Sequence, residues 1–286
     1  MFHSVQLGAL HMAVFMKREL IWFCSVAEDD GVLTRAFKQI RTKGAVAISF
    51  TLFGTSLLFI GCHFKALEGN NDARVADYKF INKNLKLPRA VVENPLQPHL
   101  PDADMRFDAV FWGGDMNFRI IKERETVLKM IDRAHKHQHP HFEQLLENDE
   151  LTICMNSGEI FDGFQEGRIS FPPTYKFDPG TDNYDTSPKY RIPSYTDRIL
   201  FKSKKRHGVI CMKYLSADAV QSSDHRPVYG LYHVNLKPGR DTIPLSGGQF
   251  KRDIYVSAAK RRAIRRVAAT IKPQTGAAKS SICSVM

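Results

Sequence analysis

Four short segments of the chain carry side chains that could act on a phosphate ester. The first, residues 111–119 (FWGGDMNFR), sets Asp115 and Asn117 two positions apart, after an apolar run and two glycines. Alternate residues of an extended chain point the same way, so the carboxylate and the amide can face one group. The acid could take a proton from water while the amide donates to a phosphate oxygen. Gly-Asp-x-Asn is also typical of a simple turn, so this segment alone decides nothing.

The other three segments add acids and histidines. Asp197 and Arg198 lie in residues 193–200 (PSYTDRIL), Asp224 and His225 lie in residues 222–228 (SSDHRPV), and His63 ends an apolar run. Each has a structural alternative, such as a surface ion pair or a core histidine. Their order along the chain, each beside an apolar strand, favours one metal-assisted phosphoesterase site.

Composition limits the class of protein. A chain of 286 residues with 43% hydrophobic and 25% charged residues can bury one substantial core and is typical of a globular protein. The five cysteines are odd in number and include no CxxC pair. This argues against a disulfide framework or a structural zinc site and favours a reducing compartment.

The positive charge is concentrated at the C-terminus. The formal net charge is +11, of which about +9 falls after residue 236, where 11 Lys and Arg are opposed by two acids. We therefore expect an acidic partner, such as an anionic membrane surface, to bind the C-terminal region. A nuclease would need its basic residues along the cleft to meet a nucleic-acid backbone, so this distribution disfavours nucleic acid as a partner.

Short strands and helices alternate along the sequence. Residues 45–64 carry no charged side chain, but strand-favouring residues and the turn signal Gly54-Thr55-Ser56 predict two buried strands, 45–53 and 56–64, and not a membrane span. The predicted pattern is an α/β fold of two packed sheets flanked by helices. The other expected strands are 12–16, 20–24, 107–112, 195–201, 208–214 and 228–235, and the expected helices are 72–87, 122–137, 141–155 and 251–271.

Together the motifs resemble the endonuclease/exonuclease/phosphatase superfamily and, within it, the inositol polyphosphate 5-phosphatases. The resemblance rests on the segments quoted above and on residues 173–177 (PTYKF). Residues 161–166 (FDGFQE), 238–241 (PGRD) and 281–286 (SICSVM) resemble the type IV branch of that family. The resemblance runs from about His3 to Met286. It implies a DNase I-like four-layer sandwich, with two mainly antiparallel or mixed sheets flanked by helices, here lacking the first strands.

The resemblance also implies roles for individual residues. Asp115 would orient or deprotonate the attacking water, and Asn117 would hold the scissile phosphate. His225 would stabilise charge on that phosphate, with Asp197 hydrogen-bonded to its imidazole. The substrate would be phosphatidylinositol 4,5-bisphosphate or 3,4,5-trisphosphate.

Further residues would complete the site by the same resemblance. His63 would be a second phosphate contact, and Asp224 would lie next to a Mg²⁺ cofactor. Tyr175, Lys176 and Arg198 would grip neighbouring phosphates of the inositol ring.

In one respect the sequence departs from the family pattern. The family places a Trp-Asn segment and a Gln-Glu segment earlier, and the glutamate of the second is its principal magnesium ligand. No residues before Met12 match either segment. We therefore expect weak metal binding, an open sheet edge and, as the alternative function, a membrane-tethered phosphoinositide-binding protein with impaired catalysis.

The C-terminus predicts a lipid anchor. Cys283-Ser284-Val285-Met286 fits the C-a-a-X pattern, and a terminal Met favours farnesylation of Cys283. One lipid chain anchors marginally, so the basic residues of 251–271 would supply the second signal, although a solvated basic helix is the alternative. We expect a 5-phosphatase domain over 1–250 and a tail over 251–286, in a monomer on the cytoplasmic face of membranes. The resemblance implies Golgi and primary cilium.

One histidine pattern invites a metal-binding interpretation. The histidines at 135, 137, 139 and 141 alternate, but Pro140 breaks the element and no acids accompany them. We interpret this run as a surface junction between helices.

Overall fold

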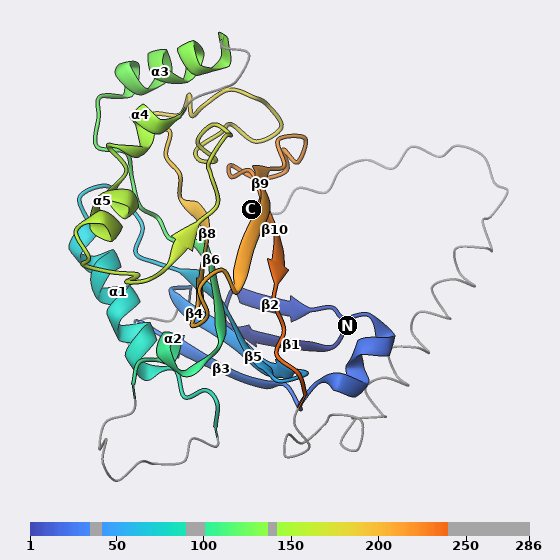
Figure 1. The fold of residues 1–286 in the computed structure, drawn as a ribbon. Coiled ribbons are helices and arrows are strands. Elements are labelled where there is room, and N and C mark those ends of the chain that lie inside the picture. The colour runs from blue at the N-terminus through green and yellow to red at the C-terminus, as the bar shows by residue number, and fades with distance from the viewer. Residues whose placement is uncertain (35–41, 90–100, 137–141, 240–286) are drawn as a thin grey trace, which may run out of the picture. The chain divides into compact units, whose positions relative to one another are not determined.

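A computed structural model describes residues 1–34, 42–89, 101–136 and 142–239 (Figure 1). The chain divides into two units, Met1–Gly247 and Gly248–Met286, and all the described residues belong to the first. The basic segment 251–271, Cys283 and most of the alternating histidines lie outside the described residues. The predicted domain boundary after residue 250 and the predicted lipid anchor therefore remain predictions.

The first unit is built on a mixed sheet of six strands in the order β3-β4-β5-β6-β8-β7. Strands β5 and β6 are parallel, and the other neighbours are antiparallel. The strands are β3 (Glu28–Leu33), β4 (Gly44–Leu52), β5 (Thr55–His63), β6 (Ala109–Asp115), β7 (Gln165–Glu166) and β8 (Asp197–Ser203).

The apolar stretch 45–64 forms two buried strands, as predicted. Strands β4 and β5 make an antiparallel pair that turns at Phe53 and Gly54. Within the described ranges, no helix has both the length and the apolar content needed to cross a membrane.

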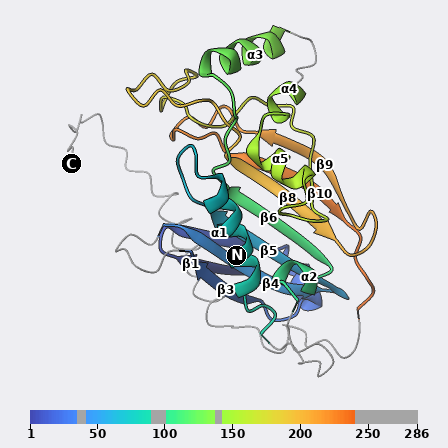
Figure 2. The same cartoon turned by 90° about the vertical axis from the view of Figure 1, so that its left-hand side faces the viewer.

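Helices cover one face of the sheet, where alternate strand residues supply the core (Figure 2). Leu58, Ile60, Val110 and Trp112 are buried there beneath α1 (Asn71–Asn84) and α5 (Glu150–Asn156). Because the side-chain period of a strand is two, the residues between them face the other way. The short α2 (Ala103–Arg106) lies on the helical side as well.

Two antiparallel strand pairs pack against the opposite face. They are β1 (His3–Leu7) with β2 (Leu10–Val14), and β9 (Val209–Ser216) with β10 (Val228–Val234). Phe59 and Phe111 stack with ring centroids 5.2 Å apart, and Phe111 meets Tyr232 of β10 at 5.1 Å. The α/β fold with packed sheets and helices is confirmed. In the described residues its second layer is two separate strand pairs.

Some local predictions were wrong. Of residues 20–24, predicted as a strand, 20–23 belong to a 3-10 helix (Arg18–Phe23), and the strand β1 was not predicted. The predicted helix 141–155 is two helices, α4 (Glu143–Leu146) and α5, because Asp149 starts a new helix by accepting a hydrogen bond from the Thr152 amide. The helix predicted at 122–137 is α3 (Arg124–Lys136).

Candidate active site

Strand register places three of the predicted site residues in one row. His63 at the end of β5 pairs with Asp115 at the end of β6, and Asp115 pairs with Asp197 at the start of β8. Residues paired across neighbouring strands share a face of the sheet. All three therefore lie on the face that carries the β9–β10 pair, at the same edge of the sheet.

Direct contacts link the row to His225, which lies just before β10. His63 Nε2 lies 3.1 Å from Asp115 Oδ2, and His225 Nδ1 lies 2.9 Å from Asp197 Oδ2. The hydroxyls of Thr174 and Thr196 each donate to Asp197 Oδ2 at 2.9 Å. A carboxylate held by three partners orients the imidazole through Nδ1, so the Nε2 of His225 is directed away from Asp197.

The charges around Asp115 and His225 favour an ionised Asp115 and a protonated His225. Burial raises the pKa of Asp115, but the hydrogen bond from His63 and the nearby charges of His225, His63 and Lys43 outweigh it, so the net pKa is lowered. Burial lowers the pKa of His225, but Asp197, Asp115 and Asp224 together raise it above its ordinary value. Asp115 is thus ionised at neutral pH, while His225 is protonated more readily than a free histidine.

Asn117 occupies a turn immediately after β6. Its φ is +57°, a left-handed conformation that Asn tolerates better than most residues. Its backbone amide donates to Asp115 Oδ1 at 3.0 Å, and its side-chain Nδ2 donates to the Phe64 carbonyl at 3.3 Å. The turn holds the buried Asn117 amide beside the carboxylate of Asp115.

The PTYKF loop reaches the same place. The Tyr175 ring lies 4.6 Å from the His225 ring, and Tyr175 also forms a β-bridge with His225. Lys176 Nζ lies 3.1 Å from Asp185 Oδ1. Burial raises the pKa of Asp185, but hydrogen bonds from Ser187, the Arg191 amide and Lys176 hold it well below its usual range. Tyr175 therefore borders the site, while Lys176 is tied to a buried acid.

The role predicted for Arg198 requires correction. Its side chain is 1% exposed and points to the helical face of the sheet. Its guanidinium donates to both oxygens of Glu166, at 2.8 and 2.6 Å, and to Asp149 Oδ2 at 2.7 Å. A guanidinium that is buried and held by two carboxylates on the helical face is not presented to an inositol phosphate at the site on the other face. Arg198 ties β8 to β7 and to the start of α5.

The described residues supply at most a partial ligand set for a metal ion. Asp224 lies one residue from His225, and its Oδ1 accepts a hydrogen bond from Ser223 at 3.4 Å. Within the described ranges, no three His, Cys, Asp or Glu side chains gather as metal ligands. Mg²⁺ often uses only one or two carboxylates beside water and phosphate oxygens, so Asp224 fits such a site only as one of its ligands.

Several residues around the site were missed at the level of sequence. Thr174 and Thr196 bind Asp197, Lys43 contacts His63, and Arg119 holds Asn117. Thr174, Thr196 and Arg119 lie inside the motifs quoted above. Arg119 is two positions after Asn117, so the alternation of side chains along an extended segment could have suggested it. Lys43 precedes β4 and carries no comparable signal.

Comparison with known proteins agrees with this geometry. Residues 1–231 match the Endonuclease/Exonuclease/phosphatase family 2. The phosphatidylinositol polyphosphate 5-phosphatase type IV of Rattus norvegicus is 45% identical over 283 residues, which cover 97% of this chain and 42% of the relative. The Homo sapiens type IV enzyme is 45% identical over 279 residues, covering 97% of this chain and 43% of the relative. The chain thus spans less than half the length of these relatives.

A solved structure supports the same assignment. It is the inositol polyphosphate 5-phosphatase domain of SPsynaptojanin, in complex with inositol (1,4)-bisphosphate and calcium ion. The match has a TM-score of 0.66 and 30% identity, and it covers 94% of this chain and 70% of that chain. A Cimex nitrophorin, at 23% identity and a TM-score of 0.55, shares the fold alone. The chain therefore belongs to the Endonuclease/Exonuclease/phosphatase family 2 and, within it, to the inositol polyphosphate 5-phosphatases.

Proposed function

We propose that this chain hydrolyses the 5-phosphate of phosphatidylinositol 4,5-bisphosphate and 3,4,5-trisphosphate. The observation that carries the proposal is the row of His63, Asp115 and Asp197 across three strands, with His225 bound to Asp197. The names of the type IV relatives, which are 45% identical, support the substrate class.

The geometry supports a separate catalytic role for each of these side chains. The ionised Asp115 carboxylate would orient a water molecule and accept its proton. The Asn117 amide and the His225 imidazole would donate to the phosphoryl oxygens as negative charge develops on them. Asp197 keeps His225 oriented through Nδ1 and stabilises its protonated form. His63 would add a third donor, beside Asp115.

We further propose Mg²⁺ as the cofactor, with Asp224 as one of its ligands. The calcium ion in the SPsynaptojanin complex supports a divalent metal in this family. When bound, the metal would neutralise charge on the phosphate. Because the described residues hold no three-ligand group, the remaining ligands would come from water, the substrate phosphate or residues outside the described ranges.

Membrane attachment is a separate proposal. Farnesylation of Cys283 together with the basic residues of 251–271 would hold a monomer on the cytoplasmic face of membranes. Golgi and primary cilium are proposed from the resemblance to the type IV branch. Mass spectrometry of the chain from eukaryotic cells, with Cys283→Ser as the control, would reveal a farnesyl mass on the C-terminal peptide. An unmodified wild-type peptide would contradict the anchor.

Phosphate release from vesicles tests the catalytic proposal. The purified full chain is incubated with vesicles containing phosphatidylinositol 4,5-bisphosphate, in Mg²⁺ or in EDTA, and inorganic phosphate is measured. We expect release in Mg²⁺ that EDTA abolishes. Vesicle binding without release would instead support the alternative, a phosphoinositide-binding protein with impaired catalysis. Nicking of plasmid DNA under the same conditions would favour a nuclease.

A further inference from the structure

Arg119 is a buried cation that the proposed mechanism does not use. The residue is 5% exposed, and within the described part of the chain no carboxylate forms an ion pair with its guanidinium. By contrast, the buried Arg74 pairs with Glu150, and Arg198 pairs with two acids. Burying an unpaired charge is costly, so a cation kept in this way calls for a functional reason.

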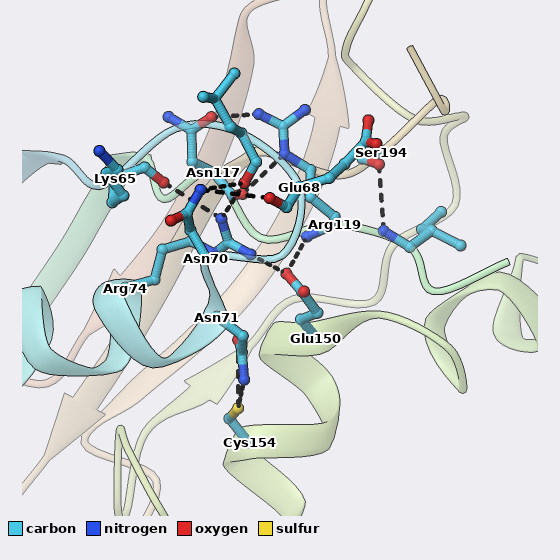
Figure 3. A network of polar contacts seen from close by, with 12 residues as sticks. Lys65, Glu68, Asn70, Asn71, Arg74, Asn117, Arg119, Glu150, Cys154 and Ser194 are labelled. Carbon is cyan, nitrogen blue, oxygen red and sulfur yellow. Dashed lines mark hydrogen bonds and ion pairs between the residues drawn. The ribbon is translucent and has the colours of Figure 1, made fainter.

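The guanidinium grips Asn117 at two points, as Figure 3 shows. Arg119 Nε donates to the Asn117 carbonyl at 3.0 Å, and Nη2 donates to Asn117 Oδ1 at 2.5 Å. A guanidinium has donors only, so the amide oxygen of Asn117 must face it. This contact and the Phe64 carbonyl, which can only accept, fix the amide with its nitrogen directed away from Arg119. The amide nitrogen then reaches the Phe64 carbonyl with one hydrogen and keeps the second for another acceptor.

The backbone of Arg119 is anchored from the helical side. Its amide donates to Glu150 Oε2 at 2.8 Å, and the Glu150 amide donates back to the Arg119 carbonyl at 2.9 Å. Arg74 of α1 also donates to Glu150 Oε2, and all three residues are buried (Figure 3). Since Glu150 lies on α5 and Arg74 on α1, both buried, these contacts hold the Arg119 backbone as a fixed base for its side chain.

The other side of the guanidinium meets the PTYKF loop. The Arg119 guanidinium carbon lies 4.6 Å from the centroid of the Tyr175 ring, within cation–π range. The same ring lies 4.6 Å from the ring of His225. One buried side chain therefore contacts Asn117 on β6's turn and the aromatic ring that borders His225.

We propose that Arg119 is a positioning residue that orients the Asn117 amide nitrogen toward the phosphoryl group and fixes Tyr175 beside His225. The proposal rests on the proposed phosphatase function for its kinetic consequences. The positive charge of the Arg119 guanidinium, which no carboxylate in the described residues pairs with, also favours an anion at the site. The Asn117 amide nitrogen would then already point toward a phosphoryl group that binds at the site.

A double-mutant cycle tests whether Arg119 acts through Asn117. Arg119→Lys keeps the charge but loses the planar fork, and Arg119→Met removes the charge. We expect each to lower kcat about 10- to 100-fold with a smaller change in KM, because a small misplacement near the chemistry is costly. In an Asn117→Ala background the same substitutions should lower kcat clearly less, and the loss that remains is the part that acts through Tyr175.

The control arginine for this cycle is Arg106. Its guanidinium also donates to backbone carbonyls, those of Pro101, Leu85 and Leu87, but it lies before β6, at the far end of that strand from Asp115. Arg106→Lys should leave kcat unchanged. Equal losses from Arg119→Lys in both backgrounds, or an unchanged kcat in the single variant, would overturn the proposal.

Hydrogen exchange tests the same contact without any turnover. With the asparagines of the full chain labelled with ¹⁵N, we expect the Asn117 side-chain amide to exchange slowly in the wild type and at least about tenfold faster in Arg119→Lys. Rapid exchange of this amide in the wild type would show that Arg119 does not hold Asn117, and it would overturn the proposal even if no variant folds. A wild type that releases no phosphate but protects this amide would instead refute the phosphatase function and leave the positioning intact.

Discussion

Asp197 and Arg198 are neighbours on β8, but they belong to different environments. Asp197 faces the β9–β10 side, where it binds His225 beside His63 and Asp115 in a partly exposed cluster. Arg198 faces the helices, where Asp149 and Glu166 surround it out of reach of water. One step along a strand thus separates a group suited to bind substrate from a group that joins secondary-structure elements.

The two clusters use charge for different ends. In the site, unlike charges shift the pKa values of Asp115 and His225 in opposite directions, and the side chains stay partly exposed. Around Arg198 every donor contact goes to protein acids, so the charges cancel internally. Substitutions in the first cluster should affect rate more than stability, and substitutions in the second should do the reverse.

The largest expected effect is on the rate after Asp115→Asn. The amide cannot accept a proton from water, so kcat for phosphate release should fall about 10³-fold. The free energy of unfolding, measured with urea, should change far less than the activation free energy that corresponds to this loss of rate. Asp132→Asn on the exposed face of α3 serves as the matched control and should keep full activity. A tenfold loss or less would remove Asp115 from the chemistry.

A loss of stability should follow Arg198→Met. Two acids would remain beneath the helices without their cation, and breaking a buried pair in this way costs about 3–5 kcal/mol. Urea unfolding followed by circular dichroism measures the loss. Adding Glu166→Gln to Arg198→Met should recover part of it, because one uncompensated charge is removed. If Arg198→Met instead lowered kcat with unchanged stability, Arg198 would be a substrate contact after all.

Asp197 and Arg198 also show which parts of the site could be predicted from the sequence and which could not. The motifs around Asp115, Asp197 and His225 predicted residues that the fold does bring together, since each follows or precedes a strand whose pattern is plain. The same motif suggested a substrate role for Arg198, and alternation along the strand would have argued against it. Glu166 and Asp149, the partners of Arg198, lie 32 and 49 residues away, so only the tertiary structure reveals them.

The next effect concerns the dependence of rate on pH. Asp197→Asn removes the charge that supports protonation of His225, so the pKa of His225 should fall. We expect kcat at neutral pH to fall about 10²-fold through lost orientation and charge. The pH above which kcat declines should move to lower values, as measured by phosphate release from pH 5 to 9.

The same pKa shift should be visible in stability. Because the pKa of His225 is raised on folding, its protonation stabilises the folded state fully below its unfolded value of about 6.5. That contribution disappears as the pH rises through the folded pKa. Urea unfolding of wild type and His225→Gln across this range should differ most at the acidic end. A difference that grew with pH would contradict the assigned direction.

The smallest expected effect comes from an ion pair in neither cluster. Lys136 and Asp132 lie one turn apart on α3, 2.6 Å from each other, with 71% and 65% of their side chains exposed. Lys136→Ala should cost about 0.3–0.5 kcal/mol, since water screens such a pair, and the cost should shrink further in 1 M salt. Urea unfolding at two salt concentrations measures both values. A cost above about 1 kcal/mol would mean that exposure does not separate weak ion pairs from strong ones in this protein. The contrast between Arg198 and the site would then need a cause other than burial.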